Sequence, residues 1–518
     1  MNPLAATLPL SRAGRFAAAI VTPGPDDASA AASRLPHCHR VNDLHSALNP
    51  TVVLRTMRPR NLFQIATCVE QARRLGVPVA VCGGRHAMGG QQFAQAGWLI
   101  DLSDCNRVLA FDAAKGLIEV EAGIRWPQLL AALDRLQPEA SDAADAAWTF
   151  RQKQTGADQL SIGGALSANI HGRGLDFAPM VSDIEAFTIV TADGCLRRAN
   201  RSEQPELFRL AIGGYGLFGV IASVTLRLVR RQRLQRAVSL IDVEDLMPVF
   251  DQRRAEGYTY GDWQFAIDST GPDFLRRGVF SCYRPVPGLA SEAASGAMEP
   301  ARLELSEADW TRLLLLAHTD KARAFDEYAR FYLASSGQHY DSDRHQMSRY
   351  VDHYHRAIDK AFGGRGSEMI TELYVPRARL PDFMRACAYE LRAAGANLIY
   401  GTVRLIRRDR ETFLAWARED YACVIFNLHV EHTPAGVAHA AEVFRRLIDR
   451  AAERSGSYYL AYHRFATRAQ IETCDPRMRA FLALKAAGDP QQLFHSDWYR
   501  HCRSLFDAGD RPAACNAV

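Results

Sequence analysis

The sequence lacks the long apolar run that a membrane-spanning helix requires. None of its 518 residues falls in a stretch approaching about 20 consecutive apolar residues, the length needed to cross a bilayer. It also lacks an excess of one charge, because 62 Lys and Arg residues stand against 58 Asp and Glu residues. A net charge of +4 over this length does not indicate a nucleic-acid surface. We therefore expect neither a membrane span nor a nucleic-acid partner.

Paired cysteine motifs are absent as well. The eleven cysteines include no CxxC pair, and their number is odd. A zinc ribbon or a disulfide scaffold would show paired, regularly spaced cysteines, so we interpret these thiols as mostly reduced and predict a cytoplasmic protein. Apolar residues make up 48% of the chain and charged residues 23%, which is typical of globular domains. The length predicts about three domains.

Hydrophobic periodicity predicts both helices and strands. Apolar residues recur at helical spacing from Asn61 to Leu75, and Gly76 is placed as the helix stop. Further helices are predicted over residues 126–133, 321–333, 349–362, 437–452 and 477–487. Strands are predicted over residues 77–81, 98–102, 117–120, 184–191, 220–229, 278–283, 372–375 and 424–429.

Three glycine-rich segments carry most of the functional signal. Cys82–Gly90 follows a predicted strand, and its flexible backbone is typical of an anion-binding concavity or of a loose turn with one exposed histidine. Ser161–Gly172 is dense in small residues, which let a large planar ligand lie against the backbone or else form a tightly packed core.

The third segment, Gly214–Gly219, matches the G-x-G-x-x-G dinucleotide fingerprint. That fingerprint needs a helix after the glycines, so that the helix N-terminus faces a pyrophosphate. The run Val220–Val229 is β-branched and alternating, which predicts a strand. A nicotinamide Rossmann site is therefore disfavoured.

Taken in chain order, these motifs resemble the vanillyl-alcohol oxidase / p-cresol methylhydroxylase family of FAD-linked oxidoreductases. The residues that carry the resemblance are Cys82–His86, Gly156, Ser161–Gly164, His171–Gly172, Thr191–Gly194, Gly213–Gly216 and Gly219–Ile221. The block that opens at Thr155 is especially similar to decaprenylphosphoryl-ribose oxidase. The block before it, which holds Cys82–His86, is also similar to alditol and aldonolactone oxidases. The match covers most of residues 45–230.

The resemblance implies an α+β fold, with a PCMH-type two-subdomain FAD-binding domain and an inserted α+β substrate (cap) domain. The expected organisation is a loosely ordered tail over 1–44, the FAD-binding domain over 45–230 with its subdomains split near 115, the cap over 231–455, and a C-terminal segment, 456–518, that returns to the flavin. Phe494–Asp497 resembles that terminal segment in the family.

The resemblance also implies which residues hold FAD. His86 matches the histidine that alditol and aldonolactone oxidases bond covalently to the flavin, and a neighbouring Arg85 would favour the neutral imidazole that this bond needs. Decaprenylphosphoryl-ribose oxidases lack this histidine and bind FAD non-covalently. The residues just before Ile162–Gly164 contain no cysteine, so no second covalent link is expected. The expected FAD contacts are Gly83, Gly84, Arg85, His86, Ala87, Met88, Gly89, Gly156, Ala157, Ser161, Gly164, Asn169, His171, Gly216, Ile221 and Tyr459.

By the same resemblance, the chain would oxidise a CH–OH group of a polyol, sugar or sugar lactone by hydride transfer to flavin N5, with oxygen or another electron acceptor. Arg404 matches the family's arginine, but Thr402 replaces a glutamate. Tyr462 and His463 stand where these oxidases place a lysine. Tyr462 is expected to donate a hydrogen bond to the substrate and His463 to act as general base; the alternative is that both belong to a packed aromatic strand. The alternatives are a dehydrogenase passing electrons to a quinone or a protein, and a flavin-binding protein without turnover.

The histidine-rich run from Asn427 to His432 contains residue types that can bind a metal. His429 and Glu431 share one face of a predicted strand. No second ligand pair follows at metal-like spacing, so we expect no metal and interpret His429 as a structural or pocket residue. His353–His355 is most simply a polar face of the cap.

Overall fold

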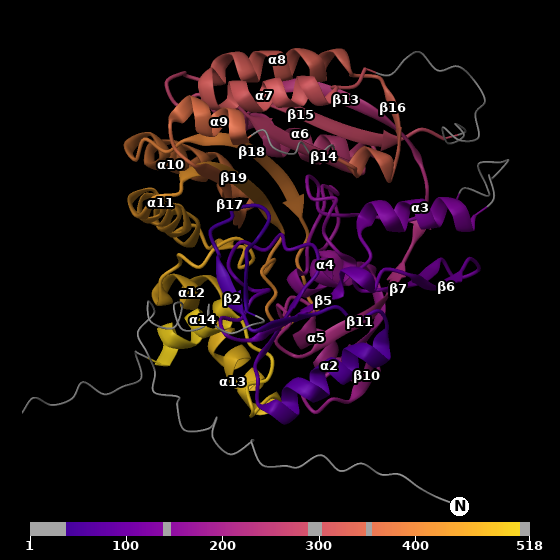
Figure 1. Cartoon of the computed structure of the whole chain (residues 1–518). Coiled ribbons are helices and arrows are strands. Elements are labelled where there is room, and N and C mark those ends of the chain that lie inside the picture. Colours follow the sequence, from indigo (N-terminus) through magenta and orange to yellow (C-terminus); the bar gives the residue numbers. More distant parts are fainter. Residues whose placement is uncertain (1–37, 138–146, 288–302, 349–354, 508–518) are drawn as a thin grey trace, which may run out of the picture.

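The computed structural model describes residues 38–137, 147–287, 303–348 and 355–507, and it confirms a mixed α+β architecture (Figure 1). The helices are α2 (Leu62–Leu75), α3 (Trp126–Leu136), α4 (Ile162–Ala168), α5 (Pro205–Ala211), α6 (Val243–Ala255), α7 (Glu307–Thr319), α8 (Lys321–Ala334), α9 (His355–Phe362), α10 (Leu380–Ala393), α11 (Pro434–Ala452), α12 (Arg468–Cys474), α13 (Met478–Gly488) and α14 (Asp497–Asp507). None of these described helices combines the length and apolar character that crossing a bilayer requires.

The N-terminal part opens with two small sheets. β1 (His39–Val41) pairs with β2 (Thr51–Val53), and a parallel three-stranded sheet has the order β3 (Arg55–Met57), β5 (Trp98–Asp101), β4 (Val79–Cys82). β1 lies within the predicted tail, whose first 37 residues fall outside the described ranges.

α2 forms where the periodicity predicts it. The Asn61 side chain accepts a hydrogen bond from the Gln64 amide at its start. Gly76 adopts φ 64° at its end, a left-handed conformation that favours glycine.

A five-stranded antiparallel sheet follows, in the order β10 (Leu196–Asn200), β9 (Ile184–Val190), β11 (Val220–Arg227), β7 (Leu117–Glu121), β6 (Val108–Asp112). β11 confirms that a strand, not a helix, follows Gly219. The expected subdomain split near residue 115 falls between β6 and β7, which pair with each other. The three-stranded sheet ends at Asp101, so the change from one sheet to the next lies between Asp101 and Val108.

The larger C-terminal part is built on an eight-stranded antiparallel sheet. Its order is β16 (His339–Asp341), β13 (Arg233–Asp242), β15 (Arg277–Pro285), β14 (Tyr260–Phe265), β18 (Leu398–Ile406), β19 (Tyr421–Glu431), β17 (Gly366–Pro376), β20 (Ser457–Tyr458). Helices α7 and α8 lie over one face, as Figure 1 shows, and α6, α10 and α11 pack on the other. A short pair of strands, β8 (Trp148–Thr149) and β12 (Val229–Arg230), lies just before the chain enters this sheet.

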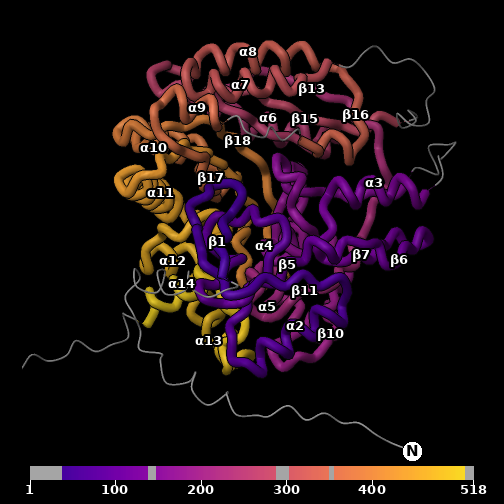
Figure 2. The backbone as a smooth tube through the Cα atoms, viewed as in Figure 1, coloured from indigo at the N-terminus to yellow at the C-terminus, as the bar shows by residue number. Residues whose placement is uncertain are grey.

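The end of the described chain returns to its beginning. The Val79 amide donates to the Leu493 carbonyl at 2.7 Å, and the His495 amide donates to the Val79 carbonyl at 2.9 Å. The segment therefore extends the edge of β4, and Figure 2 shows the yellow C-terminal helices beside the indigo N-terminal strands. Phe494 packs into the same buried cluster as the N-terminal sheets.

We expect Phe494→Ala to destabilise the protein by about 3–5 kcal/mol, because it removes a fully buried ring from that cluster. The measurement is the midpoint of urea unfolding, followed by circular dichroism. Phe63→Ala is the matched control, since Phe63 is 82% exposed and its loss should change stability by less than about 0.5 kcal/mol. Equal effects of the two variants would contradict the docking of the C-terminal segment.

Candidate functional site

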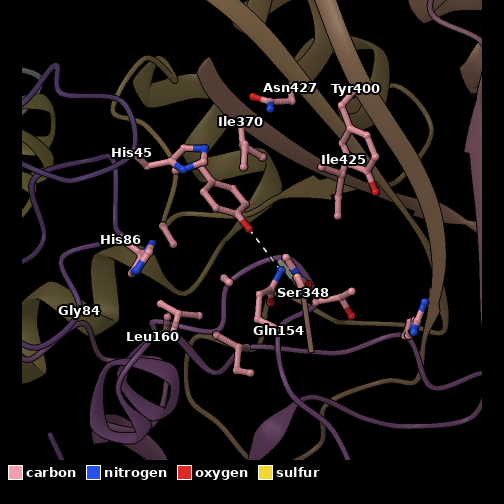
Figure 3. Close-up of a pocket in the computed structure, with 18 of the residues that line it drawn as sticks. His45, Gly84, His86, Gln154, Leu160, Ser348, Ile370, Tyr400, Ile425 and Asn427 are labelled. Carbon is pink, nitrogen blue, oxygen red and sulfur yellow. Dashed lines mark hydrogen bonds between the residues drawn. The ribbon is translucent and has the colours of Figure 1, made fainter. Parts of the chain in front are cut away.

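A cavity of about 990 Å³ lies between the glycine-rich loops of the N-terminal part and the eight-stranded sheet. Figure 3 shows Gly84 and His86 on one side of it and Tyr400 and Asn427 on the other. The cavity brings together these residues expected at the site: Gly83, Gly84, Arg85, His86, Ala87, Met88, Gly156, Ala157, Ser161, Gly164, Gly216, Ile221, Tyr459, Arg404 and Tyr462.

The first wall depends on two glycines without side chains. A Cβ atom on Gly83 would lie 2.0 Å from Oγ of Ser161, and one on Gly84 would lie 2.3 Å from the carbonyl oxygen of Gln159. The loop after β4 and the segment before α4 therefore touch backbone to backbone, and both line the cavity. Close backbone approach of this kind is typical of loops that cradle a phosphate or a flat cofactor.

His86 is placed in this wall with a neutral side chain. Burial, together with the nearby His45 and Arg125, lowers the pKa of His86 to about 4. Nε2 of His86 has no hydrogen-bond partner among the described residues. A neutral imidazole with an uncommitted nitrogen has the form required to bond an electrophilic ligand atom.

Arg85 does not act as the sequence suggested. Its Nη2 donates to Oδ2 of the buried Asp101 at 2.9 Å, so its charge is neutralised by that carboxylate. It is not among the groups that lower the pKa of His86. The sequence correctly predicts a neutral His86, but the cause is burial and not the charge of Arg85.

The floor of the cavity on the sheet side carries a buried cation. Arg404 is 3% exposed, and its Nε and Nη1 atoms have no hydrogen-bond partner among the described residues. Buried donors without hydrogen-bond partners are costly, so a guanidinium held this way favours a negatively charged or carbonyl ligand. The alternation of β18 directs Arg404 and Tyr400 to the same face.

Tyr462 lies beside this arginine. Gln154 donates through Nε2 to its hydroxyl at 3.4 Å, the bond drawn as a dashed line in Figure 3. Burial raises the pKa of Tyr462 well above its ordinary value, and the Glu372 carboxylate raises it further. The hydroxyl therefore stays protonated and can donate a hydrogen bond.

Glu372 holds a buried network beneath these two side chains. His171 Nε2 lies 2.5 Å from its Oε1, and the hydroxyl of Tyr374 donates to the same oxygen. Burial raises the pKa of Glu372, but the His171 partner and the Tyr374 hydroxyl outweigh it and lower the pKa overall. The carboxylate thus stays ionised within reach of the Arg404 charge.

Five expected site residues do not line the cavity: Gly89, Asn169, His171, Thr402 and His463. Asn169 ends α4 with φ 47°, and its side chain binds Asp409 and the Val181 amide. Thr402 is fully buried on β18. These residues support the walls and do not face a ligand in the cavity.

His463 in particular is displaced from the role of general base. Its ring stacks on Phe444 with centroids 4.7 Å apart, and its Nε2 lies 3.1 Å from Oγ1 of Thr371. Burial and Arg445 lower its pKa to about 3. A base must lie within hydrogen-bond reach of the proton that it accepts, and this ring points into the protein.

Sequence reasoning missed several polar residues of the cavity. Arg173 and Arg236 both contact Tyr283, and both line the cavity. Only Arg173 had a signal, because it directly follows the His171–Gly172 motif. His45 and Arg236 lie in segments without any motif, and the fold alone brings them to the site.

The cavity fits an extended ligand with an anionic part and a flat part. The glycine-lined wall at Gly83, Gly84 and Gly164 can approach a pyrophosphate, and Arg404 with Tyr462 offers donors to a ring at the other side. The cofactor expected from the sequence has this form.

Comparisons with known proteins agree with that fit. A family model described as an FAD binding domain matches residues 53–200. An uncharacterized oxidoreductase in the fasciation locus of Rhodococcoides fascians is 30% identical over 200 residues, which are 38% of this chain and 42% of that protein. L-gulonolactone oxidase of Bos taurus is 25% identical over 194 residues, 38% of this chain and 41% of that protein. The mitochondrial L-galactono-1,4-lactone dehydrogenase of Arabidopsis thaliana is 26% identical over 189 residues, 36% of this chain and 29% of that protein.

The chain covers less than half the length of each of these relatives. The matched residues include two of the three glycine-rich segments, those that hold His86 and Ser161. The third segment, Gly214–Gly219, lies outside the match. Residues 53–200 thus match an FAD binding domain, and over that part the chain is similar to the oxidoreductases named above.

Proposed function

We propose that this protein is an FAD-dependent oxidoreductase that oxidises the CH–OH group of a hydroxylated small molecule, such as a polyol, a sugar or a sugar lactone. The observation that carries the proposal is the buried Arg404, whose Nε and Nη1 lack hydrogen-bond partners among the described residues. It lies beside a protonated Tyr462, and both face the glycine-lined wall across one cavity. Bound FAD supplies the hydride acceptor for such an oxidation.

The chain's own residues have separate tasks in this proposal. Gly83, Gly84 and Ser161 hold the pyrophosphate by backbone approach, and His86 offers its neutral ring to the flavin. Arg404 stabilises negative charge that develops during the reaction, because preorganised donors in a dry site act strongly on such charge. Tyr462 donates its hydroxyl proton in a hydrogen bond to the substrate oxygen.

His45 replaces His463 as the proposed proton acceptor. Its ring lines the cavity, and Nε2 has no hydrogen-bond partner among the described residues. Burial lowers its pKa, so the ring is neutral near pH 7 and can take the hydroxyl proton.

The cap end of the cavity refines the expected substrate. Helices α7 and α8 line it mainly with apolar and aromatic side chains: Trp310, Leu313, Leu314, Phe325, Tyr328, Phe331 and Tyr332. These surfaces favour a substrate that carries an apolar portion next to its hydroxyl group. Hydroxylated aromatic compounds therefore belong in any substrate panel beside polyols and lactones.

The test is an anaerobic panel of polyols, aldonolactones and aromatic alcohols, read by bleaching of the flavin absorbance. Bleaching by at least one class supports the proposal, and the rate of reoxidation by air then separates an oxidase from a dehydrogenase. The lactone-oxidising relatives include both an oxidase and a dehydrogenase by name. A colourless protein that FAD does not reconstitute would overturn the proposal.

We expect FAD to be bonded covalently to His86. Flavin fluorescence should stay with the wild-type band in a denaturing gel, and His86→Ala should release it on acid precipitation. His45→Ala is the matched control, because it removes a second neutral histidine of the same cavity and should retain the bond. Flavin released from the wild type would show that the cofactor is held without a covalent bond.

We expect Arg404→Ala to lower kcat/KM by about 100- to 1000-fold, the usual effect of removing one preorganised donor. Arg404→Lys should restore part of the activity because it returns the charge. The control is Arg408→Ala, an exposed arginine four residues along the chain, which should leave kcat/KM unchanged. Similar losses in both alanine variants would remove Arg404 from the site.

A further inference from the structure

A second polar cluster lies on the same face of the eight-stranded sheet, away from Arg404. It contains His318 at the end of α7, Glu368 on β17 and His429 on β19. Glu368 pairs with His429 across the two strands, so both side chains leave the sheet at one level. His318 is contributed by α7, which lies over that face.

The three ligand atoms stand at distances typical of a metal site. His318 Nε2 lies 3.2 Å from Oε1 of Glu368, and His429 Nδ1 lies 3.8 Å from the same oxygen. All three atoms lie within 4.8 Å of one another. In a tetrahedral site with bonds of about 2.0–2.1 Å, neighbouring ligand atoms are about 3.3 Å apart.

The histidine rings face Glu368 without a well-aligned hydrogen bond. Their contacts with Oε1 of Glu368 are those of ion pairs. Neither ring nitrogen of His318, nor Nδ1 of His429, makes a hydrogen bond of good geometry among the described residues. The side chains of His318 and Glu368 are 0% and 3% exposed, so water can supply few of the hydrogen bonds that these groups lack. A buried polar atom normally has a partner, and three such nitrogens around one carboxylate need an explanation.

The backbone around the cluster is shaped for the His429 ring. A Cβ atom at Gly366 would lie 2.4 Å from Nε2 of His429 and 2.3 Å from its Cε1. With Nε2 packed against Gly366, the ring presents Nδ1 to Glu368. The His318 and His429 rings meet edge to face, with centroids 5.0 Å apart.

A third histidine stands beside these three residues. Nε2 of His355, the first residue of α9, contacts Oε2 of Glu368, and its side chain is 29% exposed. This direct contact makes His355 a partner of the carboxylate and not a metal ligand. The set of two imidazoles and one carboxylate suits zinc and similar divalent transition metals better than magnesium or calcium, which prefer oxygen ligands.

The other candidate cluster on this face does not have such geometry. His171, Glu372 and Cys423 also lie together. There His171 Nε2 and Glu372 Oε1 are only 2.5 Å apart, which is a direct hydrogen bond. Two atoms at that distance leave no room for an ion between them.

We propose that His318, Glu368 and His429 bind one divalent transition-metal ion of the zinc class, with His355 in contact with the other oxygen of Glu368. The ion joins α7, β17 and β19. This contradicts the expectation from the sequence, which found no second ligand pair near His429. The other two ligands come from α7 and β17, which are far from His429 in the chain, so no spacing motif records them.

The test uses the purified full-length flavoprotein. Metal content is measured by mass spectrometry before and after removal with a chelator, and the stripped protein is titrated with Co²⁺. We expect about one equivalent per chain, and a Co²⁺ d–d absorption at longer wavelengths than the flavin bands that Zn²⁺ abolishes. Chelation should also lower the midpoint of thermal unfolding, because a ligand bound only by the folded state stabilises it.

Variants locate the ion. His318→Gln and Glu368→Gln should each weaken Co²⁺ binding by at least about 100-fold, since changes beyond the ligands themselves already cost 10- to 100-fold. The control is His439→Gln, an exposed histidine on α11 outside the cluster, which should bind Co²⁺ as the wild type does. The flavin spectrum confirms that each variant is folded.

Two results would overturn the proposal. A stripped wild-type protein that binds neither Co²⁺ nor Zn²⁺ at micromolar concentration would do so without any variant. Unchanged binding in both cluster variants would place the metal elsewhere. Neither result depends on turnover, so the flavin-based function stands or falls separately.

Discussion

Charge buried on one face of β17, β18 and β19 is the constraint on which the rest of the molecule depends. An antiparallel sheet usually fills a covered face with apolar side chains. Here that face carries Arg404, Glu372 and Glu368, each less than 4% exposed. Buried charge is costly unless it is paired, so the surrounding elements must supply partners or a ligand must do so. The cap helices, His171 and the cavity itself are arranged to meet this demand.

The opposite wall follows a different constraint, which is steric. Gly83 and Gly84 are needed because Gln159 and Ser161 press directly against them, and any side chain would separate the two loops. The return of the C-terminal segment onto Val79 fixes the edge strand from which the first loop emerges. A wall built from backbone is rigid and has few side chains of its own. Discrimination between substrates is therefore left to the sheet face and to α7 and α8.

Local signals predicted the scaffold and one wall of the site. Asn61 and Gly76 mark the ends of α2 in the sequence, and β-branched residues after Gly219 predicted β11 correctly. The glycine-rich loops can be predicted from the sequence because close backbone approach requires glycine, and clusters of glycine are visible there. His463 was misplaced for the opposite reason: a histidine next to a tyrosine on an irregular segment can face either way, and packing against Phe444 decides it. His45 reaches the cavity only through tertiary contacts, which the pattern of apolar residues along the sequence does not predict.

The spacing along β17 links the two polar clusters. Glu372 and Glu368 are four residues apart, so they lie on the same face about 13 Å from each other, with Ile370 between them. Ile370 and Ile425 give the cavity an apolar strip that separates the two carboxylates. Each carboxylate then acts on its own partners: Glu372 on His171 and the Arg404 charge, Glu368 on His318 and His429. One strand thereby sets two different electrostatic environments, one beside the proposed flavin site and one at the proposed metal site, because its alternation directs both carboxylates to the same face.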